Sequence, residues 1–286
     1  MNGILLIDKQ PDWTSNDVVA KLKGILRQRR IGHYGTLDPM ATGLLVVFVG
    51  RATRAVEFAE GHDKRYIAGL RLGITTDTQD ITGTVLEERP VTVTEQDILN
   101  VLPAFRGEIL QIPPMYSALK VNGQKLYDLA RKGKEVERQP RPITVHELEL
   151  LHFDGQDARI RVRCSKGTYI RTLCEDMGEK LGCLGCMAAL RRTRAGEYTV
   201  EKAVPLQTLL DAENPEQYLL SMDSPFLGYP AVTLSENQEK RCRNGNSFTR
   251  PLPYGTYRAY GKDGTFLMLA KVENNIMSTI KSFFEV

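Results

Sequence analysis

The sequence has few cysteines, no long apolar run and little excess of either charge. Its five cysteines are an odd number in a chain of 286 residues, which argues against a disulfide scaffold and for reduced thiols. No stretch approaches the ~20 apolar residues that a bilayer-spanning helix needs, and the apolar run near the N-terminus is too short for a signal peptide. We therefore expect a cytoplasmic protein with no membrane contact.

The net charge is only +3, from 38 basic and 35 acidic residues, and by itself says little about partners. Basic side chains are nevertheless concentrated: residues 119–141 contain seven against three acidic ones, and residues 161–194 contain eight against three. Tyr127 and Tyr169 lie within these segments, and Tyr116 lies just before the first. This pattern fits a nucleic-acid surface that combines phosphate contacts with base stacking. Solvated faces of helices and strands would give the same pattern.

Strand-like and helix-like segments are mixed along the chain, and 42% hydrophobic residues are enough for a packed core. The patterns predict strands at 3–8, 44–49, 65–73, 143–153 and 158–164, and helices at 15–30, 51–59, from Thr94, and at 168–180, with Ser15 as the cap of the first helix. Because these segments do not alternate regularly, we predict an α+β fold. After Gly228 the sequence consists mostly of short strand-like segments. Residues 229–286 are therefore predicted to form a small β-rich domain that follows a domain of residues 1–228.

Residues 31–43 are the most informative segment. They contain three glycines and Pro39, and they follow a predicted helix and precede a predicted strand, so we expect a loop with a defined backbone path. Such a loop can present the side chain of Asp38 in a fixed geometry. From these residues alone Asp38 is a turn former or a catalytic carboxylate, since Asp before Pro is common in turns.

Two other patterns indicate metal sites only weakly. Cys183 and Cys186 form a single C-x-x-C pair, whereas a structural zinc site needs four ligands and no second pair lies within range. Asp77 and Asp80 occur in TTDTQD, which suits a turn without any metal. We predict neither a metal nor a cofactor.

The segment GHYGTLDPMATGLL, which contains Asp38, resembles the GHxGTLDPxATGxL motif of the TruB family of pseudouridine synthases. In the family's N-terminal motif Lys and Pro are adjacent, whereas here Gln10 separates Lys9 from Pro11. Together the similar segments cover roughly residues 3–228, and residues 229–286 resemble more weakly the PUA-like domain of bacterial members. The other blocks follow in the family's order: LLIDKQPDWTSNDVV, KRYIAGLRLGITTDTQDITG, QIPPMYSALKVNGQKLYDLARKG, CSKGTYIRTLCEDMGEKLG and ALRRTRAG.

The resemblance implies a pseudouridine synthase fold, with a mixed, largely antiparallel central sheet flanked by helices. It also implies an enzyme that isomerises uridine-55 in the T loop of tRNA, without a cofactor, as a monomer that needs no obligate protein partner. Asp38 is then the catalytic nucleophile, and Arg171 is the cation that keeps it ionised. Tyr66 is implied to stack on the uracil, and it is also the family's candidate catalytic residue for helping to remove the C5 proton.

Further residues take substrate-binding roles through the same resemblance. His33 is implied to fill the space that a flipped base leaves in the RNA. Tyr169 and Leu190 are implied to line the pocket, although packing in the core accounts for Leu190 equally well. Contacts to the substrate or the RNA are also expected from Lys9, Lys120, Arg131, Lys132 and Lys166.

Two other functions remain compatible with parts of the sequence. An RNA-binding protein or tRNA-folding chaperone would use the basic segments, but it would not need Asp38, Tyr66 and Arg171 together. A glycosidase of small nucleosides would need a second carboxylate as general acid, and no partner motif for one appears.

Overall fold

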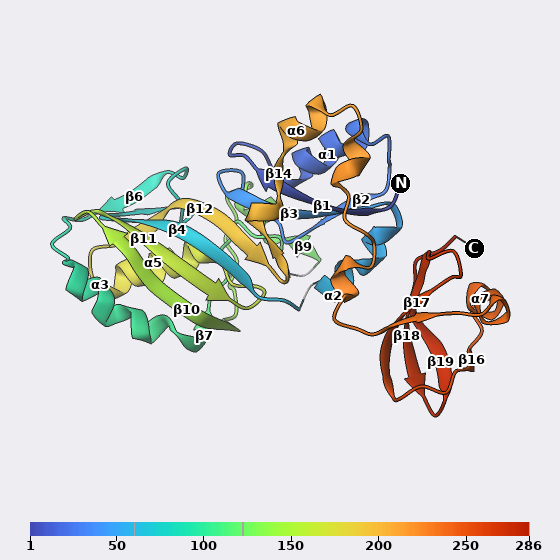
Figure 1. Cartoon of the computed structure of the whole chain (residues 1–286). Helices are drawn as coiled ribbons and strands as arrows, with labels where there is room; N and C mark the ends of the chain where they lie inside the picture. The colour runs from blue at the N-terminus through green and yellow to red at the C-terminus, as the bar shows by residue number, and fades with distance from the viewer. Residues whose placement is uncertain (60, 122, 286) are drawn as a thin grey trace.

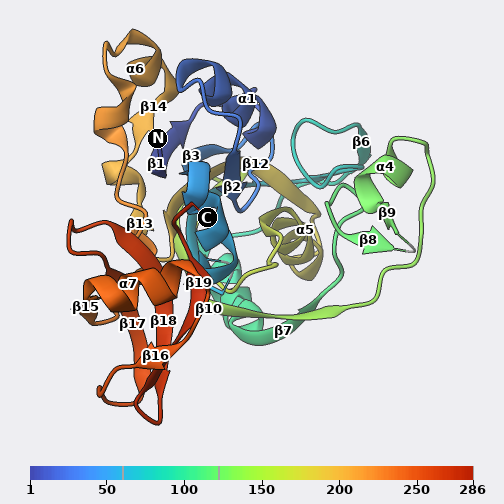
Figure 2. The same ribbon diagram turned by 90° about the vertical axis from the view of Figure 1, so that its right-hand side faces the viewer.

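The computed structural model describes residues 1–59, 61–121 and 123–285. Two sheets dominate the chain, and Figures 1 and 2 show the smaller, C-terminal one set to one side of the larger. Among the described residues the larger sheet has ten strands, in the order β14-β1-β3-β12-β4-β11-β10-β7, with β2 beside β3 and β13 beside β12. Its strands are β1 (Gly3–Lys9), β2 (Ile31–Tyr34), β3 (Thr42–Val49), β4 (Lys64–Leu72), β7 (Gly107–Gln111), β10 (Arg141–Phe153), β11 (Asp157–Cys164), β12 (Gly185–Ala195), β13 (Tyr198–Thr199) and β14 (Val204–Pro205).

The large sheet is mixed, because β14 runs parallel to β1 and β12 runs parallel to β3, whereas the other neighbours are antiparallel. This arrangement confirms the predicted α+β class. The α-helices are α1 (Ser15–Ile25), α2 (Val56–Ala59), α3 (Glu95–Val101), α4 (Leu126–Ala130), α5 (Ile170–Lys180), α6 (Leu206–Asp211) and α7 (Glu236–Arg243). Shorter 3₁₀ segments are Gly50–Ala55, Leu102–Phe105, Val200–Lys202, Pro215–Tyr218 and Ser224–Phe226. Two small hairpins pair β5 (Ile74–Thr76) with β6 (Val85–Glu88) and β8 (Lys120–Val121) with β9 (Gln124–Lys125).

Strands β1 and β3 are buried on both faces, which explains why GILLID and LLVVFV are nearly continuous apolar runs. Successive side chains of a strand point to opposite faces. One set of β1 and β3 side chains packs in a core together with residues of α1 and α5. This set is Leu5, Ile7, Leu45 and Val47. The other set packs in a second core together with C-terminal aromatic residues, namely Ile4, Leu6, Leu44, Val46 and Phe48.

The C-terminal module is a five-stranded sheet that packs against the larger part of the chain. Phe226 connects the two, with ring centroids 5.3 Å from Phe58, 6.0 Å from Phe266 and 5.7 Å from Phe283. β15 starts just beyond the predicted boundary near Gly228, and the domain boundary itself stays a prediction. The strands are β15 (Ala231–Thr233), β16 (Phe248–Thr249), β17 (Gly255–Tyr260), β18 (Phe266–Glu273) and β19 (Ile276–Ser282), in the order β15-β17-β18-β19-β16.

Three local predictions about the N-terminal part were wrong. Thr14, not Ser15, caps α1, because its side chain accepts a hydrogen bond from the backbone of Asp17. The helix ends at Ile25 rather than near residue 30, since Arg27 adopts a φ of 47° in the left-handed region. Residues 31–43 are not wholly a loop, because β2 at their start pairs with β3.

Candidate active site

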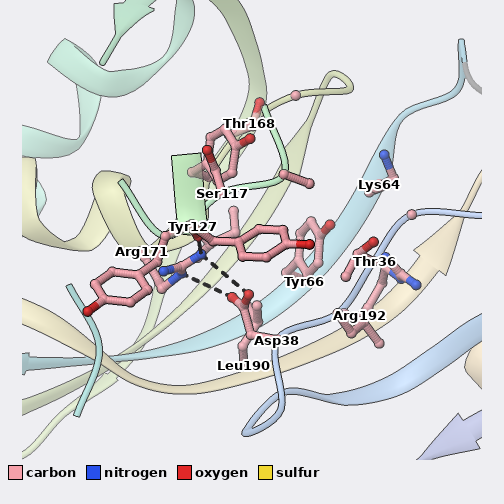
Figure 3. Close-up of a pocket in the computed structure, with 17 residues that line it drawn as sticks. Thr36, Asp38, Lys64, Tyr66, Ser117, Tyr127, Thr168, Arg171, Leu190 and Arg192 are labelled. Atoms are coloured by element: carbon pink, nitrogen blue, oxygen red, sulfur yellow. Dashed lines mark hydrogen bonds and ion pairs between the residues drawn. The ribbon is translucent and has the colours of Figure 1, made fainter. Parts of the chain in front are cut away.

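A cavity of about 380 Å³ lies where β4, β12 and the N-terminal end of α5 meet the segment of residues 35–41, here called the Asp38 loop. Its volume falls in the range of sites that hold small ligands. Aromatic, charged and small side chains share its walls, as Figure 3 shows. The lining residues are Gly35, Thr36, Leu37, Asp38, Lys64, Tyr66, Tyr116, Ser117, Ala118, Tyr127, Gly167, Thr168, Tyr169, Ile170, Arg171, Leu190 and Arg192.

The backbone of the Asp38 loop forms a turn around Pro39. The carbonyl oxygen of Asp38 accepts a hydrogen bond from the Ala41 N–H at 3.0 Å, with proline at the second position of the turn. Gly43 follows with a φ of 93°, and a Cβ there would lie 2.3 Å from the Arg192 carbonyl oxygen, so only glycine permits this approach of β3 to β12. Asp38 is thus a turn former through its backbone, while its side chain faces the cavity.

Ser15 and Lys9 hold the loop from beneath. The Ser15 hydroxyl accepts a hydrogen bond from the Leu37 N–H at 2.9 Å and donates one to the Leu37 carbonyl at 3.2 Å. The Lys9 ammonium donates to the carbonyls of Gln10, Trp13 and Pro39 at 2.9, 2.6 and 3.0 Å. Both side chains are 1% exposed, so the loop is anchored by buried polar contacts to β1 and α1.

Ser15→Ala is expected to lower kcat about tenfold with a smaller change in KM, because the loop loses the side chain that fixes Leu37 and with it the position of Asp38. The free energy of unfolding should fall by about 1–3 kcal/mol, since the Leu37 N–H loses its acceptor. Steady-state kinetics and urea unfolding measure both. Thr14→Ala is the matched control: it removes the cap of the same helix, at about 1 kcal/mol, without touching the loop. An equal loss of kcat in Thr14→Ala would contradict the positioning role of Ser15.

Asp38 is paired with Arg171 across two contacts. Arg171 Nε lies 3.0 Å from Oδ2 of Asp38, and Nη2 lies 3.3 Å from Oδ1, as the dashed lines in Figure 3 mark. The guanidinium also donates to the carbonyls of Thr78 at 3.1 Å and Tyr116 at 2.8 Å, and Arg171 is 5% exposed. A planar guanidinium held at four points presents a fixed fork to the carboxylate.

Burial in the cavity raises the pKa of Asp38, and the charge of Arg171 acts in the opposite direction without outweighing it. Nearby Asp80 raises this pKa further, and Lys9 lowers it. The Asp38 side chain is nevertheless 34% exposed, so a ligand in the cavity can reach it. Its ionised form is thus poorly solvated and accessible, which are the properties of a reactive carboxylate.

The predicted pocket residues all line the cavity. Tyr66 is 7% exposed, and burial raises its pKa to about 12, so its phenolate is scarce at neutral pH. Leu190 is also 7% exposed and serves both roles proposed for it, since it packs in the core and faces the cavity. Tyr169 occupies the N-cap position of α5, where its backbone N–H donates a hydrogen bond to the side chain of Gln111 and its carbonyl accepts one from it.

The expected RNA-contact residues fall into three groups. Lys120, Arg131 and Lys132 are exposed in or beside β8, β9 and α4, which project from the body of the molecule in Figure 2. Lys166 is exposed in the turn before α5. Lys9, in contrast, is buried with its ammonium surrounded by carbonyls, so its expected role as a substrate contact does not agree with its position.

His33 lies in β2 beside the cavity rather than in its lining. Its side chain is partly buried, and Nδ1 has no hydrogen-bond partner among the described residues. Burial, and then the charge of Arg192, lower the pKa of His33, which favours the neutral ring.

Lys64 and Arg192 line the cavity but were not anticipated as site residues. Side chains two positions apart on a strand share a face. Lys64 therefore lies on the same face of β4 as Tyr66, and Arg192 on the same face of β12 as Leu190, with Arg192 paired to Tyr66 in register. This alternation was the available signal, because both pairs occur in the recognised motifs.

The patterns that weakly indicated metals form ordinary local structure. Asp80 Oδ1 accepts from the hydroxyl of Thr78 at 2.9 Å and from the N–H of Thr82 at 3.0 Å, as in a turn. Cys183 and Cys186 are free and buried. Over the described ranges of the chain, no three His, Cys, Asp or Glu side chains are grouped so that they could hold a metal. In the same ranges no helix has the length and apolar character to cross a membrane.

Most of the chain matches sequence models of one protein family. Residues 23–170 match the sequence model of the TruB family pseudouridylate synthase N-terminal domain, and residues 171–226 match that of the tRNA pseudouridylate synthase B C-terminal domain. The chain belongs to the TruB family. It is therefore an enzyme, a tRNA pseudouridine synthase that isomerises uridine to pseudouridine.

The similarity to other members of the TruB family extends over nearly the whole chain. A tRNA pseudouridine synthase B of Pseudomonas fluorescens is 45% identical over 283 residues, which cover 96% of this chain and 93% of the relative. That of Clostridium kluyveri is 40% identical over 289 residues, covering 99% and 100%. Among solved structures, a chain of a Cbf5-Nop10-Gar1 complex superimposes with a TM-score of 0.73 at 27% identity, over 99% of this chain and 85% of that one.

Proposed function

We propose that this TruB enzyme isomerises uridine-55 in the T loop of tRNA, with Asp38 as the nucleophile. The observation that carries the proposal is the Asp38–Arg171 pair in a cavity with aromatic walls. Asp38 is the only carboxylate among the described residues that line this cavity. The site therefore offers one carboxylate, a cation fixed beside it, and flat aromatic surfaces on which a base can stack.

The reaction needs no group from a third molecule. The bond between ribose C1′ and uracil N1 breaks, a bond between C1′ and C5 forms, the C5 proton leaves, and N1 gains a proton. Breaking the first bond develops positive charge at C1′, and a carboxylate beside that carbon stabilises the charge or bonds to it. Because burial destabilises the ionised form of Asp38, pairing with a cationic carbon is favourable.

The remaining residues suit extraction and holding of one base. A uridine stacked in an RNA loop must be flipped out before it can react, at a cost of a few kcal/mol. Tyr66 offers a stacking surface inside the cavity, and Tyr169 and Leu190 supply apolar contact. His33, beside the cavity, would occupy the space vacated in the RNA. For Lys9 we propose a positioning role under Pro39 in place of a substrate contact.

A nucleoside glycosidase fits this geometry less well, because it would need a second carboxylate in the cavity. Asp80 lies near Asp38, but it is outside the cavity lining, and its Oδ1 is engaged in the turn around Thr78. A protein that only binds or refolds RNA has no use for a poorly solvated carboxylate facing phosphates. Isomerisation uses the carboxylate, the cation beside it and the aromatic walls together.

A tritium assay tests both the reaction and its position. A tRNA transcript labelled at C5 of its uridines should lose one equivalent of tritium per tRNA, and sequencing for pseudouridine should find it at position 55. A transcript with cytidine at position 55 should lose none. Tritium release with pseudouridine at another position would overturn the proposed specificity while leaving the family activity intact.

Arg131→Ala and Lys132→Ala are each expected to weaken tRNA binding with a shallower salt dependence. Loss of one phosphate contact should reduce the slope of log K against log salt by about 0.7–0.9. Binding measured at several salt concentrations gives the slope. Lys180→Ala, at the exposed C-terminal end of α5, is the control and should keep the wild-type slope. Wild-type slopes in both variants would remove these residues from the phosphate contacts.

A further inference from the structure

Cationic side chains lie on two sides of the cavity, and only the one on the first side, Arg171, is paired with a carboxylate. Figure 3 shows Arg171 on one side of Asp38 and Lys64 and Arg192 on the other. Lys64 is the first residue of β4, and Arg192 lies on the neighbouring strand β12. Over the described parts of the chain, neither Lys64 nor Arg192 forms an ion pair with a carboxylate.

Arg192 is the more unusual of the two, because it is completely buried and largely unpaired. Its exposed fraction is 0%, and only Nε has a clear partner, the Leu44 carbonyl at 2.7 Å. Neither terminal nitrogen meets the distance and angle of a full hydrogen bond to a described residue, although the guanidinium lowers the pKa of the Tyr66 hydroxyl through its charge and a side-chain hydrogen bond. Buried charges are usually paired with a counter-charge, so a buried guanidinium with no carboxylate beside it leaves a positive potential in the cavity wall.

Lys64 completes this wall. Its ammonium lies 4.9 Å from the centre of the Tyr34 ring, and burial, followed by the charge of Arg192, lowers its pKa to about 8. Lys166 adds a further positive charge nearby. The neighbouring carboxylate of Asp63 is already shared between Arg163 and His146, each at 3.2 Å. The wall therefore holds uncompensated positive charge that an anion would stabilise.

The anion available in the substrate is a phosphate. A uridine within RNA enters with one phosphate on each side, and placing its C1′ at Asp38 leaves the opposite wall free for the backbone. We propose that Lys64 and Arg192 form a phosphate subsite that holds one of the two phosphates flanking the flipped uridine. In this subsite Lys64 contacts the phosphate directly, and Arg192 contributes its charge from behind Gly35. The guanidinium packs closely against this glycine, because a Cβ added to Gly35 would lie 3.0 Å from Nη1 of Arg192. This subsite rests on the proposed function.

A thermodynamic cycle tests the contact without relying on activity. Each flanking phosphate gives one cycle of four combinations: wild type or Lys64→Met, with a T stem-loop RNA that is unmodified or carries a neutral methylphosphonate at that phosphate. One cycle uses the phosphate 5′ of the target uridine, and the other uses the phosphate 3′ of it. In wild type the methylphosphonate at the contacted position should weaken binding about tenfold, as expected for a charge-assisted hydrogen bond. In Lys64→Met the same substitution should change binding less than about twofold, because the partner is already absent.

Two controls make the result specific. Lys132→Met should stay fully sensitive to the methylphosphonate, since its expected phosphate lies elsewhere, and a methylphosphonate in the distal stem should affect wild type and Lys64→Met equally. Absence of coupling at both flanking phosphates would overturn the subsite. Tritium release from uridine-55 by wild type is scored separately, so its failure would count against the proposed function rather than against the subsite alone.

Discussion

Asp38→Asn is expected to lower tritium release from tRNA by at least about 10⁴-fold, because an amide can neither bond to C1′ nor balance positive charge there. Binding of tRNA should stay within about threefold of wild type, since Asn has the size of Asp and the cationic surfaces are untouched. Release assays with excess enzyme and filter binding measure the two. Tritium release near the wild-type rate would exclude Asp38 as the nucleophile.

The same variant should not lose stability near neutral pH. Burial raises the pKa of Asp38 in the folded chain, so at any pH above that raised pKa the ionised carboxylate lowers the free energy of unfolding. A neutral Asn removes this penalty, and the melting temperature at pH 7–8 is expected to equal or exceed that of wild type. As the pH falls through the raised pKa, Asp38 becomes neutral too and the difference should shrink. A lower melting temperature at pH 7–8 would contradict this electrostatic account.

Replacing Arg171 by Met should have the second-largest effect on catalysis, with a loss of about 10²–10³-fold in kcat, typical for removal of a charge that orients and stabilises a reacting group. Asp38 would lose the cation that lowers its pKa, so its pKa rises further. The acid limb of the pH–rate profile should therefore move to higher pH, and part of the lost activity should return as the pH rises. The variant should also be about 3 kcal/mol less stable, because the carbonyls of Thr78 and Tyr116 lose a buried donor.

Arg171→Lys is the matched control for this prediction. It keeps the positive charge but not the planar fork that contacts both carboxylate oxygens and both carbonyls. The acid limb should shift less than in Arg171→Met, while kcat still falls because Asp38 is held less firmly. An acid limb at the wild-type position in Arg171→Met would show that Arg171 does not control the ionisation of Asp38.

These expectations share one cause: burying charged groups in the wall of the cavity lowers the free energy of unfolding of the protein. Asp38 is a carboxylate with a raised pKa, and Arg192 is a buried guanidinium without a carboxylate partner among the described residues; both line one cavity. Such groups persist where the surrounding structure holds them, as Ser15 and Lys9 hold the Asp38 loop. The surrounding core is regular, with β1 and β3 buried on both faces.

The sequence by itself determined what is local or carried by a motif. The apolar runs of β1 and β3 predicted buried strands, and the glycines and proline of residues 31–43 predicted a constrained backbone, because each depends on the conformations of a few adjacent residues. The family resemblance added the pairing of Asp38 with Arg171, which are 133 positions apart and which no local pattern could join.

Only the tertiary structure decided which polar side chains face the cavity and which are already bonded to other parts of the protein. A lysine such as Lys9 is chemically suited to contact RNA, but the fold places three backbone carbonyls around its ammonium. Arg192 sits among Arg191 and Arg194 in the sequence, yet Arg191 pairs with Asp8 and Arg194 with Glu197, while Arg192 points inward beside Tyr66. The reason is physical: burial and counter-charge arise from strands brought together across the sheet, and the pairing of β4 with β12 is not encoded in either strand alone.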